Sequence, residues 1–247
     1  MNKYLLIWLL PLAAVSSLKS QDMDKNDKIN YIPVADIKKT ADFEITGDGS
    51  SREWEKAVWM ELWKVQFGED QRPVKAKVMY SGKGLYFLAE CVDKKLTCPV
   101  NEDMGDLYTG DVVEVFIWPN VEEAVYFEYE ISPLNNELVL MVPNDNGTFH
   151  GWLPWHYEGD RKIIHKTKVS GGKQENGAEV TGWTAEFFIP FVLLTGLGNV
   201  PPESGSQWRM NICRIDYDGE ETIHWTWSPG TSNKFHSYQR FGIFRFE

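Results

Sequence analysis

The chain has 247 residues, of which 43% are hydrophobic and 25% charged, a composition that excludes an intrinsically disordered protein. Its formal net charge of -11 would repel a phosphate backbone, so we expect no nucleic-acid partner. The 11 tryptophans are unusually many and are typical of a sandwich core, a sugar-stacking surface, or both.

Residues 1–20 have the layout of a cleaved secretory signal peptide. Lys3 gives a positive start, residues 4–15 are apolar and too few to span a membrane, and small residues follow. The first cysteine is Cys91, so an N-terminal lipid anchor is not expected. We expect an exported protein, free in the periplasm or outside the cell, with no membrane span.

Residues 21–39 predict a polar tether that ends in an edge strand near residues 31–34, and residues 40–247 predict one domain. From residue 40 on, apolar residues recur with a period of two, which is typical of half-buried strands. The predicted strands are 75–80, 84–93, 111–118, 124–132, 138–142, 163–169, 182–189, 208–217, 223–228 and 241–246. Only residues 191–197, after Pro190, suggest a short helix. The sequence therefore predicts an all-β, antiparallel β-sandwich with few short helices, and a monomer.

Single aromatic residues and cysteines leave some alternatives open. Tryptophans within strands (Trp183, Trp208 and Trp225) are predicted core residues, whereas Trp152 and Trp155 lie in a loop. The 3 cysteines are too few for a disulfide framework, and no CxxC pair is present for a tetrahedral zinc site. Cys91, Cys98 and Cys213 can still form one bridge and a spare thiol, or remain buried and unpaired.

Motifs of common enzyme classes are missing: the chain contains no GxSxG, HExxH, P-loop or GxGxxG. Carboxylates are the remaining candidates, since glycoside hydrolysis needs two of them across the scissile bond. Glu128 and Glu130 point to one face of their strand, and Glu114 lies on an otherwise apolar face. Glu114 is therefore either paired with Arg209 or Arg214, or it contacts a ligand.

Several motifs, in this order and spacing, resemble those of the family 9 carbohydrate-binding modules and their DOMON-like relatives. The motifs are Gly47-Asp-Gly with Trp54, residues 84–89 with Asp93, residues 111–117, residues 183–190, residues 208–216, and Trp227-Ser-Pro with Phe241-Gly. The resemblance extends from about residue 43 to residue 247. It implies a β-sandwich that binds sugars without cleaving them.

The resemblance also implies site residues. Tyr108 and Phe235 match the two aromatic rings that clamp a terminal sugar, and Glu114 matches a binding glutamate. Glu128 and Glu130 stand where the family has Arg and Asn, and Ser232 stands where it has Asn. These six residues are the predicted carbohydrate-binding set, and no catalytic residue is assigned. Some family members bind calcium, so calcium is the cofactor left open, without a matched ligand set.

Three functions follow as hypotheses. The first is a non-catalytic protein that binds a plant-type polysaccharide or oligosaccharide, xylan-like or glucan-like, in carbohydrate catabolism. The second is a glycoside hydrolase, or an accessory part of one, with Glu114 and Glu130 as the pair to test. The third is a haem-binding DOMON-like domain, which needs an axial methionine and histidine, here Met141 and His236.

Overall fold

The structure is a computed structural model, described here for residues 30–65, 73–144, 150–219, 222–231 and 233–247. The predicted signal peptide, residues 21–29 of the predicted tether and Ser232 lie outside the described residues. Within the described part of the chain, no helix is long and apolar enough to cross a membrane.

Strands dominate the described residues, and the helical segments are short 3-10 turns. The strands are β1 (Val34–Lys39), β2 (Met60–Glu61), β3 (Trp63–Lys64), β4 (Val74–Tyr80), β5 (Gly84–Val92), β6 (Val112–Trp118), β7 (Val125–Ile131), β8 (Glu137–Pro143), β9 (Ile164–Ser170), β10 (Gly182–Pro190), β11 (Gln207–Asp216), β12 (Ile223–Thr226) and β13 (Gly242–Phe246). The turns are η1 (Arg52–Lys56), η2 (Leu107–Thr109), η3 (Gly159–Arg161), η4 (Phe191–Leu194), η5 (Pro229–Thr231) and η6 (Tyr238–Arg240). Every strand predicted from the period of two is present, and η4 is the expected short helix. The strands β2 and β3 were not predicted, because a two-residue strand is too short to show a period.

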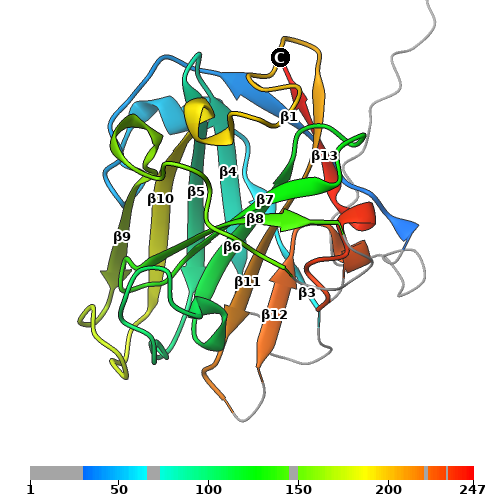
Figure 1. Cartoon of the computed structure of the whole chain (residues 1–247). Coiled ribbons are helices and arrows are strands. Elements are labelled where there is room, and N and C mark those ends of the chain that lie inside the picture. Colours follow the sequence, from blue (N-terminus) through cyan, green and yellow to red (C-terminus); the bar gives the residue numbers. More distant parts are fainter. Residues whose placement is uncertain (1–29, 66–72, 145–149, 220–221, 232) are drawn as a thin grey trace, which may run out of the picture.

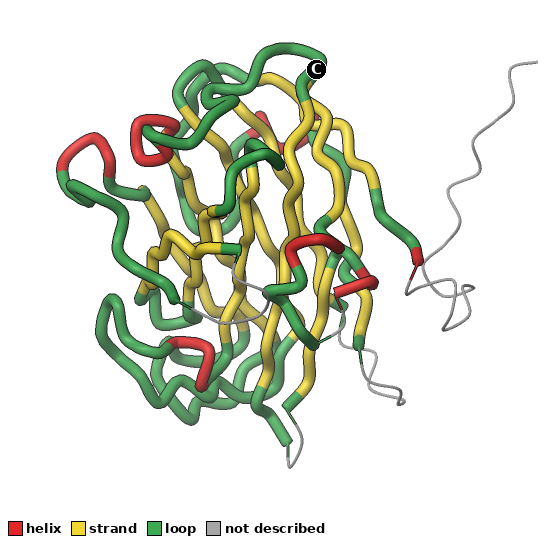
Figure 2. Tube along the Cα trace, turned by 45° about the vertical axis from the view of Figure 1, so that its right-hand side comes forward, coloured by secondary structure: helices red, strands yellow, loops and turns green. Residues whose placement is uncertain are grey.

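The strands form two curled layers that pack face to face (Figures 1 and 2). One layer has the order β8-β7-β6-β11-β13, the other has the order β4-β5-β10-β9, and β1 joins β13 to β4. Neighbouring strands in these layers run antiparallel, whereas β1 runs parallel to both of its partners. The predicted antiparallel β-sandwich is confirmed, with β1 as the exception.

The predicted edge strand near residues 31–34 is wrong in position, because the strand of this region is Val34–Lys39. β1 begins at Val34, pairs with β13 as far as Ile37, and then pairs with β4 through Lys38 and Lys39. Each part of β1 therefore pairs with one neighbouring strand, and β1 is the last strand of each layer. The exposed pattern of the strand, in which Ile37 is the only buried residue, agrees with this edge position. Side-chain polarity indicated an edge, but not that one strand serves both layers.

The main core lies between the two layers. The Phe187 ring of β10 stacks on Phe87 of β5 at 5.0 Å, and it reaches Tyr129 of the opposite layer at 4.8 Å. The tryptophans predicted for the core are confirmed as buried residues: Trp183, Trp208 and Trp225. Trp152 and Trp155 keep 50% and 78% of their surface exposed. The three cysteines are free thiols and all are buried, so the unpaired alternative holds.

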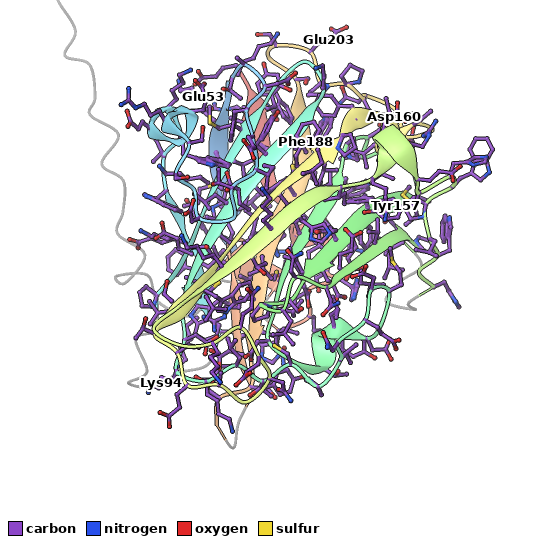
Figure 3. The ribbon with its side chains drawn as sticks, turned by 90° about the vertical axis from the view of Figure 1, so that its left-hand side faces the viewer. Glu53, Lys94, Tyr157, Asp160, Phe188 and Glu203 are labelled. Atoms are coloured by element: carbon purple, nitrogen blue, oxygen red, sulfur yellow. The ribbon has the colours of Figure 1, made fainter. Side chains whose placement is uncertain are left out.

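A second apolar cluster covers the outer face of β5 and β10. It contains Trp54, Tyr86 and Leu88, and Phe188 packs against it. Figure 3 shows the β9 and β10 side of the molecule, where Phe188 is labelled; its ring lies 4.6 Å from Tyr86. The segment that contains the Gly47-Asp-Gly and Trp54 motif thus lies on one layer of the sandwich, away from the opposite layer.

Candidate functional site

Strand alternation gives β6 two different faces. Val113, Val115 and Ile117 point into the core between the layers, whereas Glu114 and Phe116 point to the outer face of this layer. The register with the neighbouring strands then sets the neighbours on that outer face. Glu114 is paired directly with Glu130 of β7, and Phe116 with Glu128.

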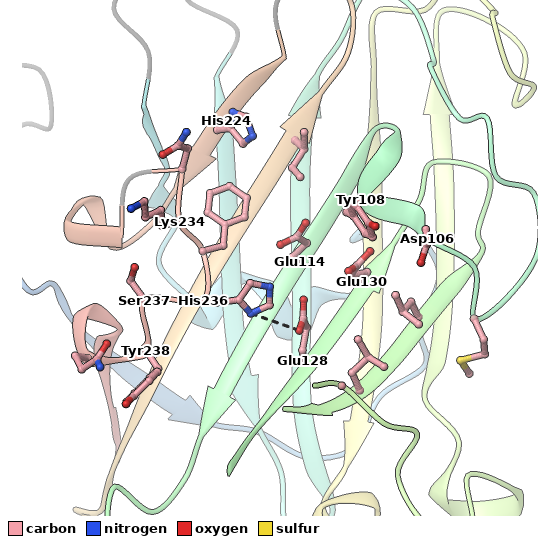
Figure 4. A pocket seen from close by; sticks show the side chains of 18 residues that line it. Asp106, Tyr108, Glu114, Glu128, Glu130, His224, Lys234, His236, Ser237 and Tyr238 are labelled. Carbon is pink, nitrogen blue, oxygen red and sulfur yellow. Dashed lines mark ion pairs between the residues drawn. The ribbon is translucent and has the colours of Figure 1, made fainter. Parts of the chain in front are cut away.

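These carboxyl groups line a pocket of about 1030 Å³ on the outer face of β6 and β7 (Figure 4). The η2 turn and the residues before it form one side, and the chain between η5 and η6 forms the other. The lining residues of the described chain are Met104, Asp106, Tyr108, Glu114, Glu128, Glu130, Leu138, Leu140, Gly151, Ile215, His224, Asn233, Lys234, Phe235, His236, Ser237, Tyr238 and Gln239. A pocket of this volume can hold a small ligand.

The structure brings five of the six predicted site residues together in this pocket: Tyr108, Glu114, Glu128, Glu130 and Phe235. Ser232 lies outside the described residues. The two aromatic residues differ in their surroundings. The Tyr108 side is open, with 48% of the residue exposed, whereas Phe235 is only 6% exposed. The Phe235 ring packs 6.5 Å from Phe116 and 5.6 Å from His224, so it is both a wall of the pocket and a core residue.

Each of the three glutamates keeps no more than 3% of its surface exposed. Burial is the main cause of their raised pKa values, since a charged carboxylate loses hydration there. Burial, and then the charges of Glu130 and Glu128, hold the pKa of Glu114 well above its usual value. Burial, and then Glu130, do the same for the pKa of Glu128. For Glu130, burial raises the pKa to about 8, against a backbone hydrogen bond from Tyr108.

Of the two alternatives left open for Glu114, pairing with Arg209 or Arg214 is excluded. Cys213 is the residue of β11 opposite Glu114, so Arg214, one residue further on, has its side chain on the core face. There the Arg214 guanidinium donates to Asp93 and Asp216, both at 2.7 Å. Arg209 lies opposite Trp118, towards the other end of the strand, and donates through Nε to the Phe241 carbonyl at 2.8 Å.

His236 lies beside Glu128 in the pocket, as the dashed line in Figure 4 shows. Its Nδ1 atom is 3.9 Å from the Glu128 carboxylate and shares a 2.7 Å hydrogen bond with the Tyr126 hydroxyl. Burial lowers the pKa of the His236 imidazole to about 4. At neutral pH the imidazole is therefore uncharged, and it does not neutralise Glu128.

The hypothesis of a haem site between Met141 and His236 is wrong. Met141 packs against the core between the layers, together with its strand neighbour Val139. His236 lies on the outer face, over Phe116, with 5.5 Å between ring centroids. The sheet separates the two side chains, so they cannot be axial ligands of one haem.

A second acidic group is formed by Asp93, Asp111 and Asp218, each with one carboxylate oxygen within 4.8 Å of the others. Asp93 accepts hydrogen bonds from Arg214, the Trp183 indole and two backbone N–H groups. Both Asp111 oxygens also accept backbone N–H groups, from residues 97 and 217. These acidic side chains accept hydrogen bonds from the protein itself, including from the buried Arg214 guanidinium. We assign no calcium ion to this group.

Most residues of the η5–η6 side were not predicted, and no local signal identifies them. His224, Lys234 and Tyr238 line the pocket from β12, from the loop and from η6. They follow no period and no motif, because the loop is held by contacts with β6, β7 and β11 that are distant in sequence.

Comparison with known proteins gives a family and a fold. Residues 45–247 match the family described as carbohydrate family 9 binding domain-like. Exoglucanase XynX of Acetivibrio thermocellus is 25% identical over 191 residues, which are 76% of this chain and 15% of that enzyme.

Three solved structures share the fold. A Bacteroides uniformis protein proposed to bind carbohydrate has a TM-score of 0.70 and 15% identity, over 88% of this chain and 100% of that one. A family 9 carbohydrate-binding module of Caldicellulosiruptor kristjanssonii, in complex with cellotriose, has a TM-score of 0.61 and 18% identity, over 87% and 94% of the two chains. The glucose complex from the same organism gives a TM-score of 0.61 and 17% identity, over 87% and 96%.

Proposed function

The chain belongs to the carbohydrate family 9 binding domain-like family, and from that premise we propose that it binds a sugar, without cleaving it, in the pocket over β6 and β7. The observation that carries the proposal is the pocket itself. It combines one open aromatic ring, Tyr108, with the buried carboxyl groups of Glu114, Glu128 and Glu130. An aromatic face stacks on the C–H face of a sugar ring, and carboxyl groups exchange hydrogen bonds with its hydroxyls.

The substrate class that we propose is a β-linked glucan or xylan oligosaccharide, or a chain end of such a polymer. Support comes from the Caldicellulosiruptor kristjanssonii modules, which hold cellotriose and glucose, and from the exoglucanase relative. This chain spans only 15% of that enzyme, so its activity is not transferred here.

Glycoside hydrolysis is the second candidate, because Glu114 of β6 and Glu130 of β7 are directly opposite each other on adjacent strands. The pKa shifts of the glutamates favour sugar binding over sugar hydrolysis. A hydrolase needs one protonated and one ionised carboxyl group, which requires environments that move the two pKa values apart. Here burial raises the pKa of all three glutamates, and neighbouring glutamates raise it further for Glu114 and Glu128.

Sugar binding can be tested by isothermal titration calorimetry with ligands chosen from a glycan array. Tyr108→Ala is expected to weaken binding about tenfold to hundredfold, since a stacked ring contributes about 1–3 kcal/mol. Tyr31→Ala is the matched control, because Tyr31 is 41% exposed and does not line the pocket. Phe235→Leu keeps the core filled while removing the aromatic wall. Affinity that is unchanged in both pocket variants would contradict the proposed site.

We further propose that the protein is exported, because residues 1–20 have the layout of a signal peptide. Mass spectrometry of the protein from its native host is expected to find a mature N-terminus between residues 17 and 22. An intact Met1 would contradict export by this route. If the purified protein releases reducing sugar from glucan or xylan, and Glu114→Gln abolishes the release, the non-catalytic proposal is wrong.

A further inference from the structure

The pocket holds more carboxyl groups than a neutral sugar requires. Glu114 and Glu130 are directly opposite each other on adjacent strands, and like charges in this position are destabilising. Glu128 lies on the same face of the same strand as Glu130, one pleat repeat away. Three nearly fully buried carboxyl groups therefore share one wall of the pocket.

Two atoms of this wall have no hydrogen-bond partner among the described residues. They are Oε2 of Glu128 and Oε2 of Glu130, both fully buried by their surroundings. Buried polar atoms are nearly always satisfied in native proteins, so such atoms in a pocket indicate a ligand that supplies donors.

The basic side chains near the three glutamates do not provide a positive charge that would neutralise them. The titratable groups that face the pocket are Asp106, Tyr108, Glu114, Tyr126, Glu128, Glu130, His224, Lys234, His236 and Tyr238. Among these residues, Lys234 is the one lysine or arginine, and it is exposed on the loop. Burial lowers the pKa of both His224 and His236, to about 4 for His236, which disfavours the charged imidazoles.

A single metal ion does not match this spacing. In the described chain, the acidic group with oxygens within 4.8 Å of one another is that of Asp93, Asp111 and Asp218, and the three glutamates do not meet that distance. A small ion would contact only some of them. An ammonium group carries three N–H donors around one positive charge. When it is attached to a sugar ring, neighbouring hydroxyls add further donors at distances of several ångströms, which suits carboxyl groups that lie apart.

From this geometry we infer that the pocket prefers sugars that carry a protonated amine, with the ammonium group between Glu114 and Glu130 and neighbouring hydroxyls at Glu128. This inference rests on the proposed sugar-binding function. An opposite charge at this position lowers the pKa of the two carboxyl groups, so binding an amino sugar releases protons. A neutral sugar releases none.

The test compares a β-linked glucosamine disaccharide with cellobiose, which has the same linkage but a hydroxyl in place of each amine. Calorimetry at about pH 6 keeps the amine protonated. We expect the amino sugar to bind at least about tenfold more tightly, the lower range of coupling between close charges across an interface. Repeating the titration in buffers of different ionisation enthalpy is expected to show proton release for the amino sugar only.

Variants that remove one carboxyl charge identify the residues responsible for the preference for the amino sugar. Glu130→Gln and Glu114→Gln are each expected to remove most of the preference for the amine while cellobiose still binds, because glutamine keeps the shape and loses the charge. Glu122→Gln, an equal charge change on an exposed loop, is expected to leave the preference unchanged. A preference that survives in both pocket variants would overturn the inference.

The outcomes separate this inference from the proposed function. If cellobiose binds as tightly as the amino disaccharide, the amine preference is wrong and sugar binding stands. If neither disaccharide binds and no glycan on an array does, both are wrong. If the N-acetylated disaccharide binds as tightly as the free amine, charge is not the basis of recognition and the inference is again overturned.

Discussion

Glu186 shows how one buried side chain can hold a segment that is far away in sequence. The residue lies on β10 and is fully buried. Its carboxylate accepts hydrogen bonds from the Trp54 indole at 2.8 Å and from the backbone N–H groups of Thr46 and Gly47 at 2.9 and 2.6 Å. The Gly47-Asp-Gly turn and Trp54, which carry part of the family resemblance, are thus tied to the sandwich by one carboxylate.

We expect Glu186→Ala to lower the free energy of unfolding by about 3 kcal/mol, because several donors lose their acceptor in a buried place. Urea unfolding followed by tryptophan fluorescence measures this change. Glu122→Ala, on the surface, is expected to stay within about 0.5 kcal/mol of the wild type. A loss for Glu186→Ala as small as that of the control would mean that water replaces the missing oxygens.

The opposed carboxyl groups of the pocket give a second prediction at this scale. Burial raises the pKa of Glu130 to about 8, so folding favours its uncharged form. Glu130→Gln is expected to raise the free energy of unfolding of the ligand-free protein at neutral pH, by an amount on the order of 1 kcal/mol. Urea unfolding again measures it, with Glu122→Gln as the control. A destabilised Glu130→Gln protein would show that the carboxylate makes contacts that glutamine cannot replace.

At the scale of elements, β1 joins the two layers. Its first residues extend the layer that contains β13, and its last residues extend the layer that contains β4. Ile37, at the point of exchange, is 1% exposed and belongs to the main core. A strand of six residues therefore contributes both backbone pairing and one core side chain to the junction.

Ile37→Ala is expected to destabilise the protein by about 2–5 kcal/mol, since it removes buried methyl groups where neither layer can move in to fill the gap. Val34→Ala, on the same strand but 48% exposed, is the matched control and is expected to change stability little. Thermal unfolding followed by circular dichroism compares the two. Equal and small shifts would mean that β1 is an attached segment and not a structural junction.

At the scale of the whole molecule, the described residues include eight buried acidic side chains and one buried basic side chain, Arg214. Besides the pocket glutamates, Glu137 is buried, and it accepts hydrogen bonds from the hydroxyl of Tyr157, labelled in Figure 3, at 2.8 Å. The Nε2 atom of His165 is 3.4 Å from the same carboxylate. Burial raises the pKa of Glu137 to about 7.

These pKa shifts predict how stability depends on pH. A carboxyl group whose pKa is raised by folding binds its proton more tightly in the native state, so stability is lost as pH rises towards that pKa. Burial raises the pKa of Glu137 and Asp111 to about 7 and that of Glu130 to about 8. His236 acts in the opposite direction, because its pKa falls from 6.5 to about 4, but only below pH 6.5.

We therefore expect the melting temperature to fall between about pH 6.5 and about pH 8, where the carboxyl groups act without opposition from His236. Differential scanning calorimetry over this range measures the slope, and Glu137→Gln is expected to make it shallower. A melting temperature that rises over the same range would mean that these carboxyl groups are already ionised in the native protein at neutral pH.

The sequence by itself determined the strands, their faces and the order of the motifs. The period of two is a property of the extended chain, so it identifies β4 to β13 and shows that Glu114 leaves the apolar pattern of its strand without reference to any other strand. The resemblance rests on the same local signals, and it named five residues that the fold brings to one pocket.

Only the tertiary structure decided which strand edges and which charges meet. The edges of β1, the partners of Arg214, the separation of Met141 from His236 and the loop that brings His236 to Glu128 all depend on residues distant in the chain. A local pattern says which face a side chain takes, whereas register and loop packing select its neighbours. This is why the sequence placed Glu114 on the correct face but left open whether an arginine pairs with it.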